Sequence, residues 1–206
     1  MTHEHGARAA ARFLAIALAG STAHAQTTER PQFKVGDRWE FAVSYGVPTT
    51  TPSRTWVITA ISADRVHGTE NGEPLVLTAE GNVLESPRFR ESNPRSLQFP
   101  LKVGKGWHYK SDWTFHAKGS KGSIALDVAV ERLEAIKVPA GEFAAFKLVA
   151  TGRLSGKSPI GSDFDAISTT TYWYAPQART IVKSVHHNPY LGTTTVELVR
   201  ASLNAE

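Results

Sequence analysis

The chain has 206 residues, no cysteine and a formal net charge of +4. The lack of cysteine excludes disulfides, thiol nucleophiles, thiolate metal sites and a lipid anchor on a cysteine. Lysine and arginine are scattered among acidic residues and form no block, so the mild positive charge does not indicate a nucleic-acid-binding protein.

The first 25 residues differ in kind from the rest of the chain. Arg8 and Arg12 precede an apolar run over residues 13–19, and the small residues Ala23 and Ala25 follow. This order is typical of a cleavable signal peptide, so we expect cleavage near Ala25 and a periplasmic or secreted protein. The run is too short to span a bilayer and no later run is longer, so we expect no transmembrane segment.

Residues 26–206 have the size of a single domain, and their dominant period is two. Trp39, Phe41, Val43 and Tyr45 alternate with smaller or polar residues, and similar alternation recurs towards the C-terminus. No segment has a convincing amphipathic helical pattern. The sequence therefore predicts an all-β domain of about ten strands with little helix, either an antiparallel sandwich or a strongly curved or half-open barrel.

Turn residues separate the expected strands. Asn71-Gly72 predicts a tight hairpin, and the sequence VPAGEF at residues 138–143 predicts another turn between apolar runs. Residues 86–100 contain three prolines and little alternation, which indicates an irregular crossover. Residues 155–165 read as a polar loop, and residues 188–192 as a hairpin loop.

Two short phrases are nearly the same, FKVGDRWEF at residues 33–41 and LKVGKGWHY at residues 101–109. In each copy a glycine would turn the chain into a strand, and the tryptophan that follows would enter the core at the start of that strand. We interpret the pair as a repeated structural device and not as a repeated ligand site. It predicts two related halves that share one core, residues 33–85 and 101–203.

The sequence contains no catalytic motif that we recognise. A G-x-S-x-G elbow is absent, and GRLSGKS at residues 152–158 has one residue too few between its glycines for a phosphate-binding loop. Asp163 and Asp165 share a face, but a polar loop offers no burial to raise a carboxyl pKa. We therefore predict no catalytic residue and no enzyme.

Histidines give no metal-binding pattern. His108 and His116 would lie about 26 Å apart along one strand, and His186 and His187 would point to opposite faces. A site that joins His108, His186 and an acid through strand pairing is an alternative, although no ligand spacing supports it. We expect no metal site and no cofactor.

The five tryptophans fall mostly on the apolar parity of the expected strands. Such rings supply bulk and cross-strand pairs to a β core without disulfides. They can also line a cleft for a sugar or a lipid, since they offer flat apolar area with a polar edge. The inward parity favours the core interpretation.

The phrases VGxxW, VPAGxFxAxK and YWYAP resemble those of a broad group of exported bacterial all-β domains of unknown function. They occur here at residues 35–39, 103–107, 138–147 and 172–183. The chain departs from this group at QART, residues 177–180, where a glycine is common. The resemblance implies an exported all-β protein and carries no catalytic residue that could be transferred.

The sequence as a whole predicts a soluble periplasmic β domain without catalytic activity, a binding or accessory module of the cell envelope whose ligand is unknown. Its expected partner is an apolar small molecule or an envelope protein. One alternative is a carrier of a lipid-like molecule in a concave aromatic-lined sheet, which requires an apolar cavity of roughly several hundred cubic ångströms. The other is a hydrolase, which requires an acid and a histidine that meet at a pocket with shifted pKa values.

Overall fold

A computed structural model describes residues 27–51, 53–116, 119–158, 160–188 and 192–205. The expected signal peptide and its cleavage near Ala25 lie outside these residues. Within them, no helix is long and apolar enough to cross a membrane. The elements are β1 (Thr27–Thr28), β2 (Arg38–Tyr45), β3 (Arg54–Ile61), β4 (Arg65–Glu70), β5 (Glu73–Thr78), β6 (Val83–Glu85), β7 (Phe89–Glu91), β8 (Leu101–Lys102), β9 (Gly106–Phe115), β10 (Lys121–Val138), β11 (Gly141–Lys157), β12 (Asp163–Ala175), a 3-10 helix (Pro176–Ala178), β13 (Thr180–Asn188) and β14 (Gly192–Ser202).

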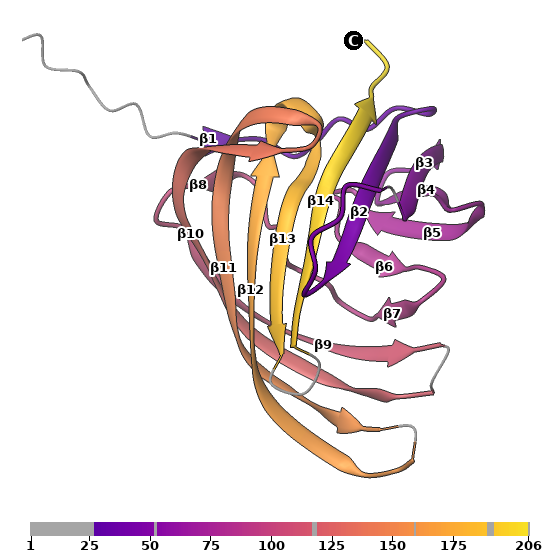
Figure 1. Cartoon of the computed structure of the whole chain (residues 1–206), viewed down its shortest axis with the longest axis vertical. Helices are drawn as coiled ribbons and strands as arrows, with labels where there is room; N and C mark the ends of the chain where they lie inside the picture. The colour runs from indigo at the N-terminus through magenta and orange to yellow at the C-terminus, as the bar shows by residue number, and fades with distance from the viewer. Residues whose placement is uncertain (1–26, 52, 117–118, 159, 189–191, 206) are drawn as a thin grey trace, which may run out of the picture.

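Twelve strands form one closed antiparallel barrel (Figure 1). Their order is β10, β11, β12, β13, β14, β2, β3, β4, β5, β6, β7 and β9, and β9 pairs back with β10. The all-β class with little helix is confirmed. The prediction of a sandwich or half-open barrel of about ten strands is wrong. Two strands that complete the wall, β6 and β7, have three residues each and are too short to show alternation.

The barrel has two unequal walls (Figure 1). The long strands β10 to β14, with β2, form one wall, in which β10 has 18 residues and β11 has 17. The shorter strands β3 to β7, with β9, form the other. β1 and β8 pair with each other in a separate two-stranded sheet. Side chains of alternate residues from both walls point into the enclosed space.

The predicted tight turns are confirmed. Asn71 and Gly72 both have positive φ, 55° and 91°, and connect the paired residues Glu70 and Glu73. Two central residues with positive φ define the type I′ turn, whose twist matches that of the flanking strands. Val138 pairs with Gly141, so the VPAGEF turn is equally tight.

Two of the expected loops are shorter in the structure than in the sequence interpretation. β11 continues to Lys157 and β12 begins at Asp163, so Asp163 and Asp165 lie on a strand and not in a mobile loop. Residues 86–100 contain β7 and are therefore not wholly irregular. For the last expected loop, Asn188 pairs with Gly192, while residues 189–191 lie outside the described part of the chain.

The repeated phrase is a structural device at both positions, as predicted. Gly36 and Gly104 have positive φ, 91° and 86°, at the turns that lead into β2 and β9. The two tryptophans differ, however. Trp39 is 1% exposed, and its Nε1 donates to the carbonyl oxygen of Ala178 at 2.8 Å. Trp107 is only half-buried. The expectation that the tryptophan enters the core is therefore correct for Trp39 and only partly correct for Trp107. Whether the two halves are related stays a prediction.

Buried apolar side chains form two clusters inside the barrel. The first combines residues of β2 to β5 with residues near the 3-10 helix, including Trp39, Phe41, Ile58, Leu77 and Val182. The second combines the segment after β7 with β9 to β12, including Leu97, Leu101, Tyr109, Phe146 and Tyr174. The segment that follows β7 therefore closes one part of the barrel with its own apolar residues.

Three glycines, Gly122, Gly152 and Gly156, lie where β10 and β11 approach each other closely. A Cβ atom on Gly152 would clash with the carbonyl oxygen of Ala125 on the neighbouring strand. A Cβ atom on Gly156 would lie 2.9 Å from the ring of Trp113. These positions let the long strands stay close together and let an aromatic ring cover them.

Replacing Gly152 with alanine is expected to lower the free energy of unfolding by about 1–3 kcal/mol, because the added methyl group overpacks against backbone that cannot move away alone. Urea unfolding measures this. Gly106→Ala is the matched control, since the nearest atom to its Cβ would be 3.3 Å away. Equal losses in the two variants would contradict the close approach at Gly152.

Candidate functional site

A cavity of about 240 Å³ lies inside the barrel. Residues from both walls line it, and its apolar part combines aromatic rings with aliphatic side chains. That part includes Trp39, Phe41, Trp56, Leu77, Phe89 and Tyr172. An apolar cavity of about 150 Å³ can hold benzene. By that comparison the cavity has room for an apolar group of about eight to ten carbon atoms.

Some polar groups of the lining serve the fold. The Asn82 amide donates to the carbonyl oxygen of Leu97 at 2.9 Å and accepts from its backbone N–H at 2.8 Å. Arg179, just after the 3-10 helix, pairs with the buried Asp37 at 3.0 Å. These contacts attach the segment after β7 and the β12–β13 turn to the barrel, and they leave their groups satisfied.

Glu70, at the end of β4, is a nearly buried acid on the cavity wall, with 7% of its side chain exposed. Its Oε2 accepts a hydrogen bond from Trp56 Nε1 at 3.0 Å. Its Oε1 lies 3.5 Å from Arg54 Nε and 3.4 Å from Arg88 Nε, both beyond the usual hydrogen-bond range of about 2.7–3.2 Å. Burial raises the pKa of Glu70, the Trp56 hydrogen bond lowers it, and the charge of Glu73 raises it again.

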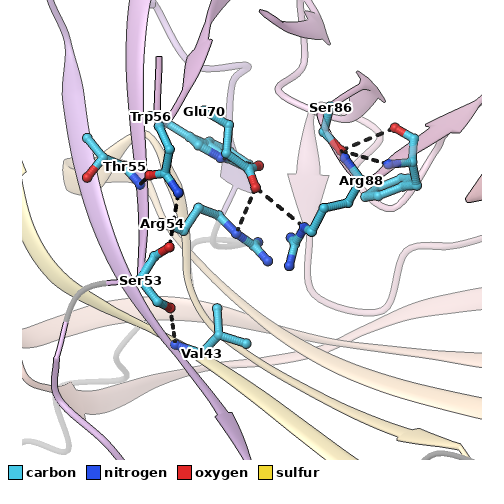
Figure 2. A network of polar contacts seen from close by, with 10 residues as sticks. Val43, Ser53, Arg54, Thr55, Trp56, Glu70, Ser86 and Arg88 are labelled. Atoms are coloured by element: carbon cyan, nitrogen blue, oxygen red, sulfur yellow. Dashed lines mark hydrogen bonds and ion pairs between the residues drawn. The ribbon is translucent and has the colours of Figure 1, made fainter. Parts of the chain in front are cut away.

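Glu70 and the two arginines separate the cavity from a second pocket. Arg54, Glu70 and Arg88 line both the internal cavity and a pocket of about 320 Å³ that includes the exposed residues Tyr45 and Glu73. Figure 2 shows the two guanidinium groups next to each other on the same side of the Glu70 carboxylate. We call these three residues the mouth of the cavity.

Glu91, on β7, is a second acid in the cavity wall. Its Oε1 is shielded from solvent and has no hydrogen-bond partner among the described residues. Burial raises the pKa of Glu91 to about 7, although a hydrogen bond with Ser111 lowers it. Burial raises the pKa values of Tyr109 and Tyr172, and the charge of Glu91 raises both further. The cavity thus holds an unsatisfied carboxyl oxygen.

Several hydroxyl groups of β9, β12 and the segment after β7 lie close to one another. The Ser96 hydroxyl is 3.4 Å from the Tyr172 hydroxyl and 3.5 Å from that of Tyr109. Thr170 is hydrogen-bonded to His186 Nδ1 at 2.8 Å. Burial lowers the pKa of His186, which favours the neutral imidazole. Of these residues, Ser96 and Tyr172 line the cavity, whereas Tyr109, Thr170 and His186 are not among its lining residues.

The structure does not bring the histidines of the alternative metal site together. His108 is half-exposed and pairs with Asp127 at 3.0 Å, whereas His186 is mostly buried. His116 pairs with Glu85 at 2.7 Å. No group of three His, Cys, Asp or Glu residues that could hold a metal ion occurs in the described part of the chain.

The two carboxylates that the sequence analysis rejected as a catalytic pair form ion pairs on the surface. Asp163 pairs with Lys157 at 2.9 Å and Asp165 with Arg153 at 2.7 Å, across the β11–β12 hairpin. All four side chains are exposed. Exposed ion pairs of this kind contribute little to stability.

The tryptophans divide between core and cavity. Trp39 and Trp56 line the cavity, and Trp39 is also fully buried. Trp113 is buried and packs against Phe115 and Phe164, with ring centroids 5.4 and 5.9 Å apart. Trp173 donates to Glu134 at 2.8 Å. The core interpretation is therefore correct for some rings, and others form the wall of the cavity.

Sequence patterns did not single out the mouth or Glu91. One signal was available, because Val66, Gly68 and Glu70 share the inward parity of β4 and a charge on that parity is unusual. Glu91 lies between Pro87 and Pro94 in a segment where no alternation could be traced. Its position in the cavity wall depends on the closure of the barrel.

The chain matches no protein-family model and no curated protein sequence. It does match solved structures. A protein from Bacteroides fragilis NCTC 9343, described as exported and with a YmcC-like fold, aligns over 86% of this chain and 100% of its own, with 12% identity and a TM-score of 0.50. This chain shares that fold. A protein from Parabacteroides distasonis ATCC 8503, described as a lipoprotein, aligns over 85% of this chain and 99% of its own, with 13% identity and a TM-score of 0.54.

The lipoprotein YmcC from Escherichia coli K12 aligns over 82% of this chain and 85% of its own, with 12% identity and a TM-score of 0.46. At the identities of the first two matches, a YmcC-like fold is all that the similarity establishes. None of the three descriptions names a ligand or a reaction.

Proposed function

We propose that the protein is a non-catalytic binding module outside the cytoplasm and that it takes a small, largely apolar molecule into the barrel. The observation that carries this proposal is the internal cavity of about 240 Å³ with its aromatic lining. Small-molecule sites are typically concave, mostly apolar and supplied with a few polar groups. The cavity therefore favours one alternative of the sequence analysis, a carrier of an apolar molecule. It does not favour an accessory protein whose barrel is completely filled by side chains.

The signal-peptide pattern supports a location outside the cytoplasm. Two proteins of the same fold are described as exported or as a lipoprotein, which agrees with that location. The present chain has no cysteine that could carry a lipid at the expected cleavage site. We therefore propose a free periplasmic or secreted protein.

The cavity does not favour the hydrolase alternative. An acid with a shifted pKa, Glu91, lies in its wall, but no histidine is among the described residues that line it. A general base and a nucleophile would have to lie within hydrogen-bond reach of each other. A binding role needs only the shape and the few polar groups that are present.

Filling the cavity tests this proposal. Ser184 on β13 lines the cavity, so Ser184→Phe is expected to weaken the binding of 1-octanol by at least about tenfold. Trp39 and Trp56 lie in the cavity wall, and their fluorescence reports the binding. Val185→Phe is the matched control, because adjacent residues of a strand point to opposite faces.

Both variants must first unfold cooperatively, since an added ring can cost about 1–3 kcal/mol in a packed interior. If octanol does not alter the fluorescence of the unchanged protein, or if the two variants lose binding equally, the cavity is not the ligand site.

A further inference from the structure

The mouth of the cavity has more positive than negative charge. Arg54 and Arg88 lie against the single carboxylate of Glu70. Glu73 lines the outer pocket, but within the described residues it is ion-paired to neither arginine. Two guanidinium groups against one carboxylate leave a net charge of +1 on these three residues. Arg88 is 43% exposed, whereas Arg54 and Glu70 are largely removed from water, with 14% and 7% of their side chains exposed. An uncompensated charge in such a place is costly unless another group pairs with it.

The arginines also have unused hydrogen-bond donors. Each guanidinium group has five N–H donors, and one carboxylate oxygen at 3.4–3.5 Å cannot satisfy them. Arg54 Nε is shielded from solvent and has no hydrogen-bond partner among the described residues. Arg88 is in contact with the Tyr45 hydroxyl. Both arginines line the two pockets.

The arrangement of the two arginines fits a carboxylate. Both guanidinium groups lie on the same side of Glu70, with their ends close together (Figure 2). Planar guanidinium groups bind carboxylates through two parallel N–H···O bonds, which a lysine ammonium cannot do. A ligand with a single negative charge would neutralise the net charge of +1 and fill the donors that Glu70 leaves free.

From these observations we propose that the ligand is a small amphipathic carboxylate. Its carboxylate binds Arg54 and Arg88 at the mouth, and its apolar part lies against Trp56, Phe41 and Phe89 in the cavity. The volume of about 240 Å³ corresponds to about eight groups of the size of a water molecule or a methylene, at about 30 Å³ each. Octanoate is therefore a suitable probe. This inference rests on the proposed function, because it specifies the chemistry of the same site.

The test compares octanoate, octyl phosphate and 1-octanol by isothermal titration calorimetry. Octanoate is expected to bind at least about tenfold more tightly than octanol, which has the same chain without the charge. Arg88→Gln is expected to weaken octanoate binding much more than octanol binding and so to remove this preference. Arg90→Gln is the matched control, since Arg90 is close in sequence, has a 72% exposed side chain and pairs with Glu85 away from the cavity.

A second variant removes the other arginine without leaving a buried charge that could destabilise the fold. Removing Arg54 alone would leave Glu70 in a buried site with less compensation, so Arg54→Gln is combined with Glu70→Gln. This double variant takes away one charge of each sign. The mouth keeps its net charge of +1 on Arg88 but loses one of its two guanidinium groups. Octanoate is therefore expected to bind more weakly than to the unchanged protein, and a preference for octanoate as large as that of the unchanged protein would show that Arg54 does not bind the carboxylate.

The outcomes separate the two proposals. Equal affinities for octanoate and octanol, both lost in Ser184→Phe, would keep the cavity as a binding site and overturn the carboxylate assignment. Octyl phosphate that binds at least about tenfold more tightly than octanoate would overturn it in favour of a phosphate group. A lack of binding by all three probes would overturn the proposed function itself.

Discussion

Replacing Trp39 with alanine is expected to lower the free energy of unfolding by about 3–5 kcal/mol, the usual cost of removing a large buried ring. Trp39 is 1% exposed and contacts Phe33 edge-on, with ring centroids 5.9 Å apart. Its indole also donates to the carbonyl oxygen of Ala178, which would lose this partner inside the protein. Chemical denaturation monitored by far-ultraviolet circular dichroism measures the change.

Trp107→Ala provides the comparison, because Trp107 occupies the same place in the second copy of the repeated phrase but is half-buried. Its indole donates to the carbonyl oxygen of Arg95 in a contact exposed to water, so water can replace it. We expect a loss clearly smaller than that of Trp39→Ala. Equal losses, or a larger loss at Trp107, would show that the first copy is not the main anchor of the barrel.

Glu91→Gln is expected to make the protein more stable above pH 7, by up to about 3 kcal/mol. Burial raises the pKa of Glu91 to about 7 in the folded protein, from the ordinary value of 4.5. Between these two values the folded state binds more protons than the unfolded state, so the free energy of unfolding falls as the pH rises. Above pH 7 the full cost of the buried charge is present, and glutamine avoids it.

The difference between the variant and the unchanged protein, measured as a function of pH, isolates this group. Glu70 also has a raised pKa and His186 a lowered one, but both titrate in either protein and cancel in the difference. The exposed Glu142 provides the control variant, Glu142→Gln. If the difference in the free energy of unfolding between Glu91→Gln and the unchanged protein stays constant between pH 4.5 and 7, Glu91 is not buried as described.

Local sequence patterns were sufficient for the local features of the fold. Alternation identified the inward face of β9, and Asn71-Gly72 identified a hairpin, because each depends on neighbouring residues alone. In β2 the alternation was correct for Trp39 and Phe41 and wrong after them. There Ala42 and Ser44 are buried, whereas Tyr45 is 71% exposed. Barrel closure depends on pairing between β7 and β9 and between β14 and β2, which are distant in the sequence. Three-residue strands contribute almost no periodic signal, so the closure could not be predicted.

Less of the candidate site than of the fold could be predicted from the sequence. Arg54 and Glu70 lie on neighbouring strands and could have been paired through the hairpin register, but Arg88 comes from the segment before β7. The two arginines, read alone, are ordinary charged residues. The charge excess at the mouth exists only because the barrel brings the second arginine to the same carboxylate.

A crystal structure of the protein with octanoate tests the central claim most directly. We expect the carboxylate within about 3 Å of nitrogen atoms of both Arg54 and Arg88, and the acyl chain inside the barrel against Trp56. An empty cavity, or octanoate bound only on the outer surface while calorimetry reports binding, would contradict the account.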